Sequence, residues 1–339
     1  MDVILYSIYV KEKPNFLILA QLYYSIKTLR KYNTEIPIVI VINSGINLEN
    51  YNINGMFNIV RDFDNIQILQ IEFSAKHLAI QKWRAVETIF NKTNYNKVLY
   101  LDNDTFFSRN PKDFFTDFSE DYFYFRPEWG DACYNIYGFY GMNSGQFFLS
   151  RKVFQQIPVN FIELIEKEIV RSYRLVLKAN KLSYKINEVI RENKKLIKSE
   201  PINFISIKEW RWSAEQFCSH KVLLDHGIQF ELFPEGLFAV GATTVVVDHS
   251  KNPCEVITPI VHYFGGFSYL WFPSDLAVEN FSWGSKLIND NSSNMFLELP
   301  KNLHCNKCYQ RIFGLKDYEK NNDKRIKELY QQLRQNGSV

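Results

Sequence analysis

The stretch "KVLYLDNDTFFSRN", residues 97–110, joins a short apolar run to two carboxylates that only Asn103 separates. The run 97–101 is predicted to be a buried strand, with Asp102 and Asp104 directly after its end. Residues i and i+2 of an extended chain point to the same side, so the two acids can converge. Paired carboxylates repel each other unless a cation lies between them, and Mg²⁺ or Mn²⁺ prefers such oxygen ligands. A plain turn with a helix cap is the alternative interpretation of Asp-Asn-Asp-Thr.

Strand and helix signals alternate upstream of this stretch. The predicted strands cover residues 3–10, 36–43, 66–73 and 97–101, and the predicted helices cover 15–32 and 79–92. Strands of nearly continuous apolar character that alternate with helices indicate an α/β fold with a mostly parallel sheet covered on both faces. Ligands of such sheets bind beyond the carboxyl ends of the strands, which is where the two acids are expected.

The pattern changes after this region. Residues 122–129 and 145–154 are predicted to be further strands. Within 160–200, Phe161, Ile165 and Ile169 form an apolar stripe among basic residues, which predicts two amphipathic helices. These helices are interpreted either as an insertion packed on the sheet or as a basic surface for a membrane or a partner. Residues 319–335 are predicted to form a polar C-terminal helix.

Composition narrows the class of protein. The chain has 339 residues, 46% of them hydrophobic, and its net charge of +3 does not indicate a nucleic-acid-binding protein. Its five cysteines do not resemble a disulfide framework, and His304, Cys305 and Cys308 supply only half of a zinc site. The first residues are interpreted as a strand and not as a signal peptide, and no run of about 18 apolar residues predicts a membrane span. A cytoplasmic location is therefore expected.

Four motifs carry a resemblance to a known family. They are "LYLDNDTFF" at 99–107, "NSG" at 143–145, "SAEQFCSHKVLLDHGIQFELFP" at 213–234 and "VHYFGGFSYLW" at 261–271. In this order they resemble the Asp-x-Asp, Asn-Ala/Ser-Gly, acidic-Gln and His-x-x-Gly elements of GT-A-fold glycosyltransferases of the glycogenin and lipopolysaccharide galactosyltransferase type. The resemblance implies a GT-A (Rossmann-like) domain over 1–271 with a helical insertion at about 155–205. Residues 272–339 are then a C-terminal extension.

The resemblance also implies an activity and a cofactor. The chain is expected to move a sugar from a nucleotide-diphosphate sugar, foremost a UDP-sugar, to an acceptor hydroxyl, with retention of configuration favoured. Asp102, Asp104 and His262 are expected to hold Mn²⁺ or Mg²⁺. The acceptor stays open among glycans, proteins, lipids and small molecules, and residues 160–200 are a candidate for peripheral membrane contact.

Further site residues follow from the resemblance and, for Tyr9, from its place at the end of the first predicted strand. Glu215, Gln216 and Asn143 are the expected catalytic group. The expected substrate-binding residues are Tyr9, Lys82, Arg84, Asp102, Asn103, Ser144, Gly145, Gly265 and Gly266. Lys82 and Arg84 compete for one role, because residues two apart on a helix do not share a face. The chain departs from the family in having Glu215 in place of Asp and Ser268 in place of Lys.

Three other functions stay open at this point. The first is an inverting transferase in which Glu215 is the general base that activates the acceptor hydroxyl. The second is a nucleotidyltransferase, although "YSIYVKEKPN" at 6–15 has no glycine for a phosphate loop. The third is a catalytically silent relative that binds a partner through residues 160–200.

Overall fold

The computed structural model describes thirteen parts of the chain: residues 1–9, 16–46, 58–72, 78–107, 110–111, 114–127, 137, 141–192, 207–234, 237–240, 247–248, 255–256 and 259–262. The expected C-terminal extension, Gly265, Gly266 and the His304–Cys308 motif lie outside the described residues.

The first half of the chain alternates strands and helices as the sequence predicts. Its elements are β1 (Asp2–Ile8), α1 (Phe16–Arg30), β2 (Ile38–Asn43), α2 (Ile59–Asp62), β3 (Ile66–Ile71), a 3₁₀ turn η2 (Leu78–Ile80), α3 (Gln81–Lys92), β4 (Lys97–Leu101), β5 (Thr105–Phe107), α4 (Phe114–Asp117) and β6 (Phe123–Pro127). The second half contains β7 (Met142–Ser150), α6 (Arg151–Phe154), α7 (Phe161–Glu192), α8 (Ile207–Asp225), β8 (Phe230–Leu232), β9 (Phe238–Val240), β10 (Val247–Asp248), β11 (Glu255–Val256) and β12 (Ile260–His262).

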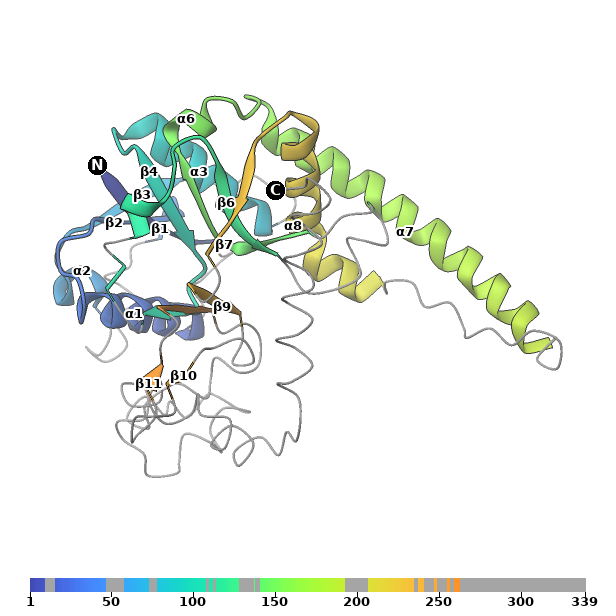
Figure 1. Cartoon of the computed structure of the whole chain (residues 1–339), viewed down its shortest axis with the longest axis horizontal. Coiled ribbons are helices and arrows are strands. Elements are labelled where there is room, and N and C mark those ends of the chain that lie inside the picture. Colours follow the sequence, from blue (N-terminus) through green and yellow to red (C-terminus); the bar gives the residue numbers. More distant parts are fainter. Residues whose placement is uncertain are drawn as a thin grey trace.

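A seven-stranded sheet in the order β3-β2-β1-β4-β7-β6-β8 forms the centre of the molecule (Figure 1). The strands β3, β2, β1 and β4 are parallel, β7 runs antiparallel to both β4 and β6, and β8 is parallel to β6. The predicted α/β class with a mostly parallel sheet is confirmed. A second sheet, in the order β5-β12-β9, starts directly after the end of β4.

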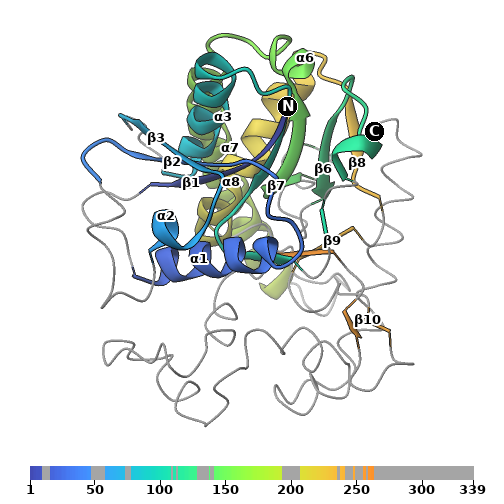
Figure 2. The ribbon, with the colours of Figure 1, turned by 90° about the vertical axis from the view of Figure 1, so that its left-hand side faces the viewer.

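Successive side chains of each strand point to opposite sides, and the inner strands β2, β1, β4 and β7 are buried on both faces. Val3 and Leu5 of β1 face a core that α3, α7 and α8 cover. Ile4 and Tyr6 face a second core under α1 and the small sheet. Figure 2 shows the two layers of helices on opposite sides of the strands. This double cover explains why the strands read as continuous apolar runs and not as alternating ones.

Two predictions about the middle of the chain are wrong in detail. The strand predicted over 145–154 ends at Ser150, whose side chain accepts a hydrogen bond from the Val153 amide and caps the short helix α6. The two helices predicted within 160–200 are one continuous helix, α7, up to Glu192. No glycine or proline interrupts residues 161–192, and the Asn180 side chain bonds the Val176 carbonyl within the helix.

None of the helices in the described parts of the chain is long and apolar enough to cross a membrane.

Candidate metal centre

The turn between β4 and β5 presents the two acids. The Asp102 amide donates a hydrogen bond to the Gly145 carbonyl of β7 over 2.7 Å, and the Thr105 hydroxyl donates to the Asp102 carbonyl over 3.0 Å. The strand β5 follows at Thr105, so the interpretation of this turn as a helix cap is wrong. The turn is therefore fixed at both ends, and both carboxylates lie at the carboxyl end of β4.

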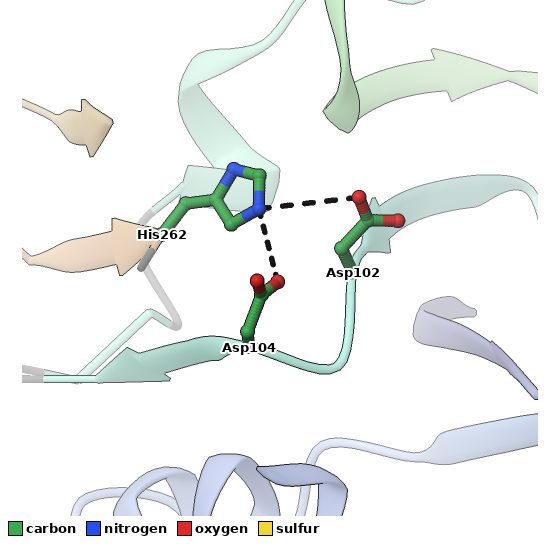
Figure 3. Close-up of side chains that lie close together, drawn as sticks. All are labelled: Asp102, Asp104 and His262. Atoms are coloured by element: carbon green, nitrogen blue, oxygen red, sulfur yellow. Dashed lines mark ion pairs between the residues drawn. The ribbon is translucent and has the colours of Figure 1, made fainter. Parts of the chain in front are cut away.

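His262 reaches the acids through strand pairing. It is the last residue of β12, which runs antiparallel to β5 and pairs His262 with Thr105. The His262 Nε2 atom lies 3.0 Å from Asp104 Oδ1 and 3.9 Å from Asp102 Oδ2 (Figure 3). One ligand atom from each of the three residues lies within 4.8 Å of the other two, and no other such group occurs among the described residues. The structure thus brings together the three residues predicted as metal ligands.

Gly145 leaves the space that this group occupies. A Cβ atom at this position would lie 2.5 Å from His262 Cε1 and 2.7 Å from Asp102 Oδ2. Both distances are shorter than real Cβ contacts, so any side chain would push two of the three predicted ligands out of place. Asn143 fixes the backbone here, because its Oδ1 atom accepts from the Gly145 amide over 2.9 Å.

A buried lysine lies behind the acids. The Lys82 Nζ atom lies 3.7 Å from Asp102 Oδ1 and 3.5 Å from Glu215 Oε2, and it donates to both oxygens of Ser144. Burial alone would lower the pKa of Lys82, but attraction by Asp102 and Glu215 outweighs burial and leaves that pKa raised. Lys82 is therefore charged. Among the described residues, no hydrogen bond or ion pair joins Arg84 to this group, so of the two competing candidates Lys82 is the one that reaches the acids.

Glu215 lies in the middle of α8 and is only 5% exposed. Its Oε1 atom accepts from the Trp83 indole over 2.7 Å and from the Ser219 hydroxyl over 3.2 Å. Its Oε2 atom accepts from the Ser144 hydroxyl over 2.7 Å and faces Lys82. A buried carboxylate needs such partners, because burying an unpaired charge is costly. The carboxylate is thus held from four directions inside the protein and is not a surface side chain.

Two tyrosines border the acids. The Tyr100 hydroxyl donates to Asp102 Oδ1 over 3.0 Å, and burial together with the Asp102 charge raises the pKa of Tyr100 well above its ordinary value. It therefore stays a neutral donor. Burial also raises the pKa of Tyr9 to about 12, a shift that Lys82 opposes and that Asp102 and Glu215 reinforce. Tyr9, at the end of β1, thus lies in the electrostatic field of the same group.

Two of the remaining predicted residues, Asn143 and Gln216, hold the backbone of β7 beside the centre. Gln216 accepts from the Ser144 amide over 2.9 Å, so it binds the same segment as Asn143. Asn103 donates weakly to the Ser7 carbonyl over 3.5 Å. Tyr100, Trp83 and Ser219 were not predicted. Only Tyr100 carried a signal, because it precedes Asp102 by two residues on the same side of a strand.

The chain is similar to known glycosyltransferases in sequence over part of its length. A family model described as "Mannosyltransferase putative" matches residues 10–136. This segment contains Lys82 and the Asp102–Asp104 pair and ends before Asn143, Glu215 and His262. The match confirms the predicted resemblance to glycosyltransferases and the enzyme class, a transferase. No curated protein matches the chain.

Similar solved structures include two glycosyltransferases. The galactosyltransferase LgtC in complex with donor and acceptor sugar analogs is 14% identical, with a TM-score of 0.46 over 85% of this chain and 94% of that chain. The apo form of the glycosyltransferase GlyE of Streptococcus pneumoniae TIGR4 is 15% identical, with a TM-score of 0.35 over 70% of this chain and 67% of that chain.

Proposed function

We propose that the chain is a metal-dependent glycosyltransferase that moves a sugar from a nucleotide-diphosphate sugar, foremost a UDP-sugar, to an acceptor hydroxyl. The observation that carries this proposal is the convergence of Asp102, Asp104 and His262 at the carboxyl end of β4. In α/β sheets this end of the strands is where ligands bind. The four motifs, in matching order, supply the reaction class.

The residues of the centre fit a divalent cation. Two carboxylates and one imidazole are a donor set that Mn²⁺ accepts readily and Mg²⁺ accepts through its oxygens. Gly145 keeps the space beside these donors open, since a Cβ atom would fill it. A cation held there would stabilise the charge that develops on the departing nucleoside diphosphate.

The other residues of the centre position these donors. Lys82 and Tyr100 both approach Asp102 Oδ1, which leaves Asp102 Oδ2 on the side of His262. Asn143 and Gln216 fix the β7 backbone that carries Gly145. We assign Tyr9 and Asn103 to the donor side of the site, because both lie at the carboxyl ends of β1 and β4. Tyr9 would then stack on the nucleotide base.

The environment of Glu215 supports the retaining alternative over the inverting one. A general base must come within hydrogen-bond reach of the acceptor hydroxyl. Both oxygens of Glu215 already accept from Trp83, Ser144 or Ser219, and the side chain is closed to solvent. We therefore infer that Glu215 is a positioning residue that holds Lys82 beside Asp102, and that it does not activate the acceptor.

The test is release of nucleoside diphosphate from a panel of nucleotide sugars in the presence of Mn²⁺. The panel includes GDP-mannose beside the UDP-sugars, because the matching family is named for mannosyl transfer. We expect release from one donor, and loss of that release in Asp104→Ala. The matched control is Asp117→Ala, which removes an exposed acid of α4 and should leave the rate unchanged.

Other outcomes would replace the proposal. Full activity of Asp104→Ala would remove the metal centre from the mechanism. Tight binding of Mn²⁺ and UDP without turnover of any donor, whatever acceptor is added, would favour the catalytically silent relative. Release of pyrophosphate in place of a nucleoside diphosphate would indicate a nucleotidyltransferase.

A further inference from the structure

The long helix α7 has two halves with different surroundings. Its first half packs on the body of the protein, where Ile165 and Ile169 are buried and the Trp210 indole of α8 donates to the Ser172 hydroxyl. Its second half runs past α8 and away from the sheet (Figure 1). Such an extension needs a physical reason, because an isolated helix is only marginally stable in water.

The second half exposes large apolar side chains. Leu175 is 40% exposed, Leu182 is 57% exposed and Tyr184 is 62% exposed. Leu175 and Leu182 are seven residues apart, which places them on the same face two turns apart. Val189 continues this spacing and is 50% exposed. An apolar stripe therefore faces outward along this part of the helix.

Charge also changes along α7. Residues 161–173 carry three acids, Glu163, Glu166 and Glu168, against two bases. Residues 174–192 carry two acids, Glu188 and Glu192, against five bases, which are Arg174, Lys178, Lys181, Lys185 and Arg191. Among the described residues, the one ion pair of α7 is that between Arg171 and Glu168, and both belong to the first half of the helix. The exposed apolar stripe of the second half is thus bordered by cations.

We propose that the second half of α7 docks onto the surface of an anionic lipid bilayer. Leucines on one face enter the boundary between headgroups and acyl chains, and the neighbouring lysines contact lipid phosphates while their stems cover apolar surface. Charge favours this occupant over a second copy of the chain, because pairing two such helices would bring cations together. A negatively charged leaflet attracts clustered basic residues such as those that border this apolar stripe.

The test is co-flotation of the full chain with lipid vesicles, which measures binding and needs no transferase activity. We expect binding to phosphatidylcholine vesicles that contain phosphatidylserine, little binding to pure phosphatidylcholine, and release at high salt. Changing Lys178, Lys181 and Lys185 to Gln should lower the partition coefficient by about 100-fold, since each cation contributes roughly 5-fold. The matched control changes three exposed bases elsewhere, Lys31, Arg61 and Lys92, to Gln, with the same loss of net charge.

Leu182→Gln tests the apolar contribution separately and should also weaken binding to the anionic vesicles. Circular dichroism establishes that each variant keeps its helix. Equal loss of binding in the two triple variants would overturn the proposal, because net charge and not α7 would then be responsible. Absence of binding to anionic vesicles would overturn it too. A dimer in solution that Leu182→Gln dissociates would assign the stripe to a second copy instead.

Discussion

Three carboxylates lie close together in this protein, and their surroundings differ sharply. Glu215, inside the protein, accepts hydrogen bonds from Trp83, Ser144 and Ser219 and faces a charged lysine. Asp102 and Asp104 lie in a partly exposed turn, where the His262 imidazole lies 3.9 Å from one carboxylate and 3.0 Å from the other. The chain itself balances the charge of Glu215. The charge of the two aspartates is balanced only in part, by Lys82 on one oxygen of Asp102.

The difference separates two functions for the same chemical group. The fold tolerates a buried carboxylate that is fully hydrogen-bonded and paired. Removing one member of such a group leaves a buried charge uncompensated, which destabilises the fold. Carboxylates that converge without a balancing cation destabilise the fold by mutual repulsion unless an ion binds. Glu215 should therefore matter for stability, and Asp104 should matter for the bound ion.

The largest expected effect concerns the stability of the apoprotein. Glu215→Ala should lower the free energy of unfolding by about 3–5 kcal/mol, because it leaves Lys82 buried without one of its two counter-charges. Asp104→Asn should leave that free energy unchanged or raise it, since it removes repulsion. Urea unfolding in the presence of a chelator measures both. A larger loss in Asp104→Asn than in Glu215→Ala would contradict the distinction.

Metal ions should stabilise the protein by binding to Asp102, Asp104 and His262. Mn²⁺ at about 100 times its dissociation constant should raise the free energy of unfolding by about 2.7 kcal/mol, and His262→Ala should abolish most of this gain. Thermal unfolding with and without Mn²⁺ gives the comparison. His226→Ala, which changes a partly exposed histidine after α8, is the control and should keep the full gain. Equal gains in both variants would remove His262 from the ligand set.

The indole bond to Glu215 should contribute less. Trp83→Phe keeps an aromatic ring where Trp83 stacks on Phe147 at 4.8 Å, but it removes the N–H donor. The expected loss is about 1.5–3 kcal/mol, the range for hydrogen bonds to charged groups. Chemical unfolding of the double variant Trp83→Phe with Glu215→Gln provides the test. The two changes should couple, and strict additivity would show that the bond is energetically unimportant.

The smallest expected loss of stability concerns Ser219, the hydrogen-bond donor that lies farthest from the Glu215 carboxylate. Ser219 donates to Glu215 over 3.2 Å, a longer and therefore weaker bond than the indole bond of 2.7 Å, so Ser219→Ala should lower the free energy of unfolding by only about 0.5–1.5 kcal/mol. The rate at which Ser219→Ala releases nucleoside diphosphate from the donor at saturating Mn²⁺ should stay close to the rate of the unchanged chain. A collapse of that rate without a loss of stability would place Ser219 and Glu215 in the chemical step and not behind it.

The sheet could be predicted because its strands are buried on both faces. The continuous apolar runs around Ile4, Ile40 and Leu99 and the helices between them specify a parallel arrangement without tertiary information. The single long helix α7 was predicted as two helices, although no glycine or proline interrupts residues 161–192. The Asn180 side chain bonds the Val176 carbonyl one turn back within the same helix.

The metal ligands could be predicted only in part. Spacing places Asp102 and Asp104 together, whereas His262 was identified by resemblance, since no local rule relates it to Asp104. The enclosure of Glu215 could not be predicted at all. Trp83 lies on an apolar helical stripe with Ile80 and Val86, so it resembles an ordinary core residue, and its indole bond depends on how α3 and α8 pack.

The small sheet β5-β12-β9 brings two chain segments that are far apart in sequence to the candidate metal centre. Its middle strand β12 carries His262, and its edge strand β5 follows the acids directly. An ion held by all three residues would join two chain segments far apart in sequence, as a covalent staple does, and would narrow the conformations open to the chain between them. Binding of the ion and the anchoring of β12 to the turn after β4 would then be a single event.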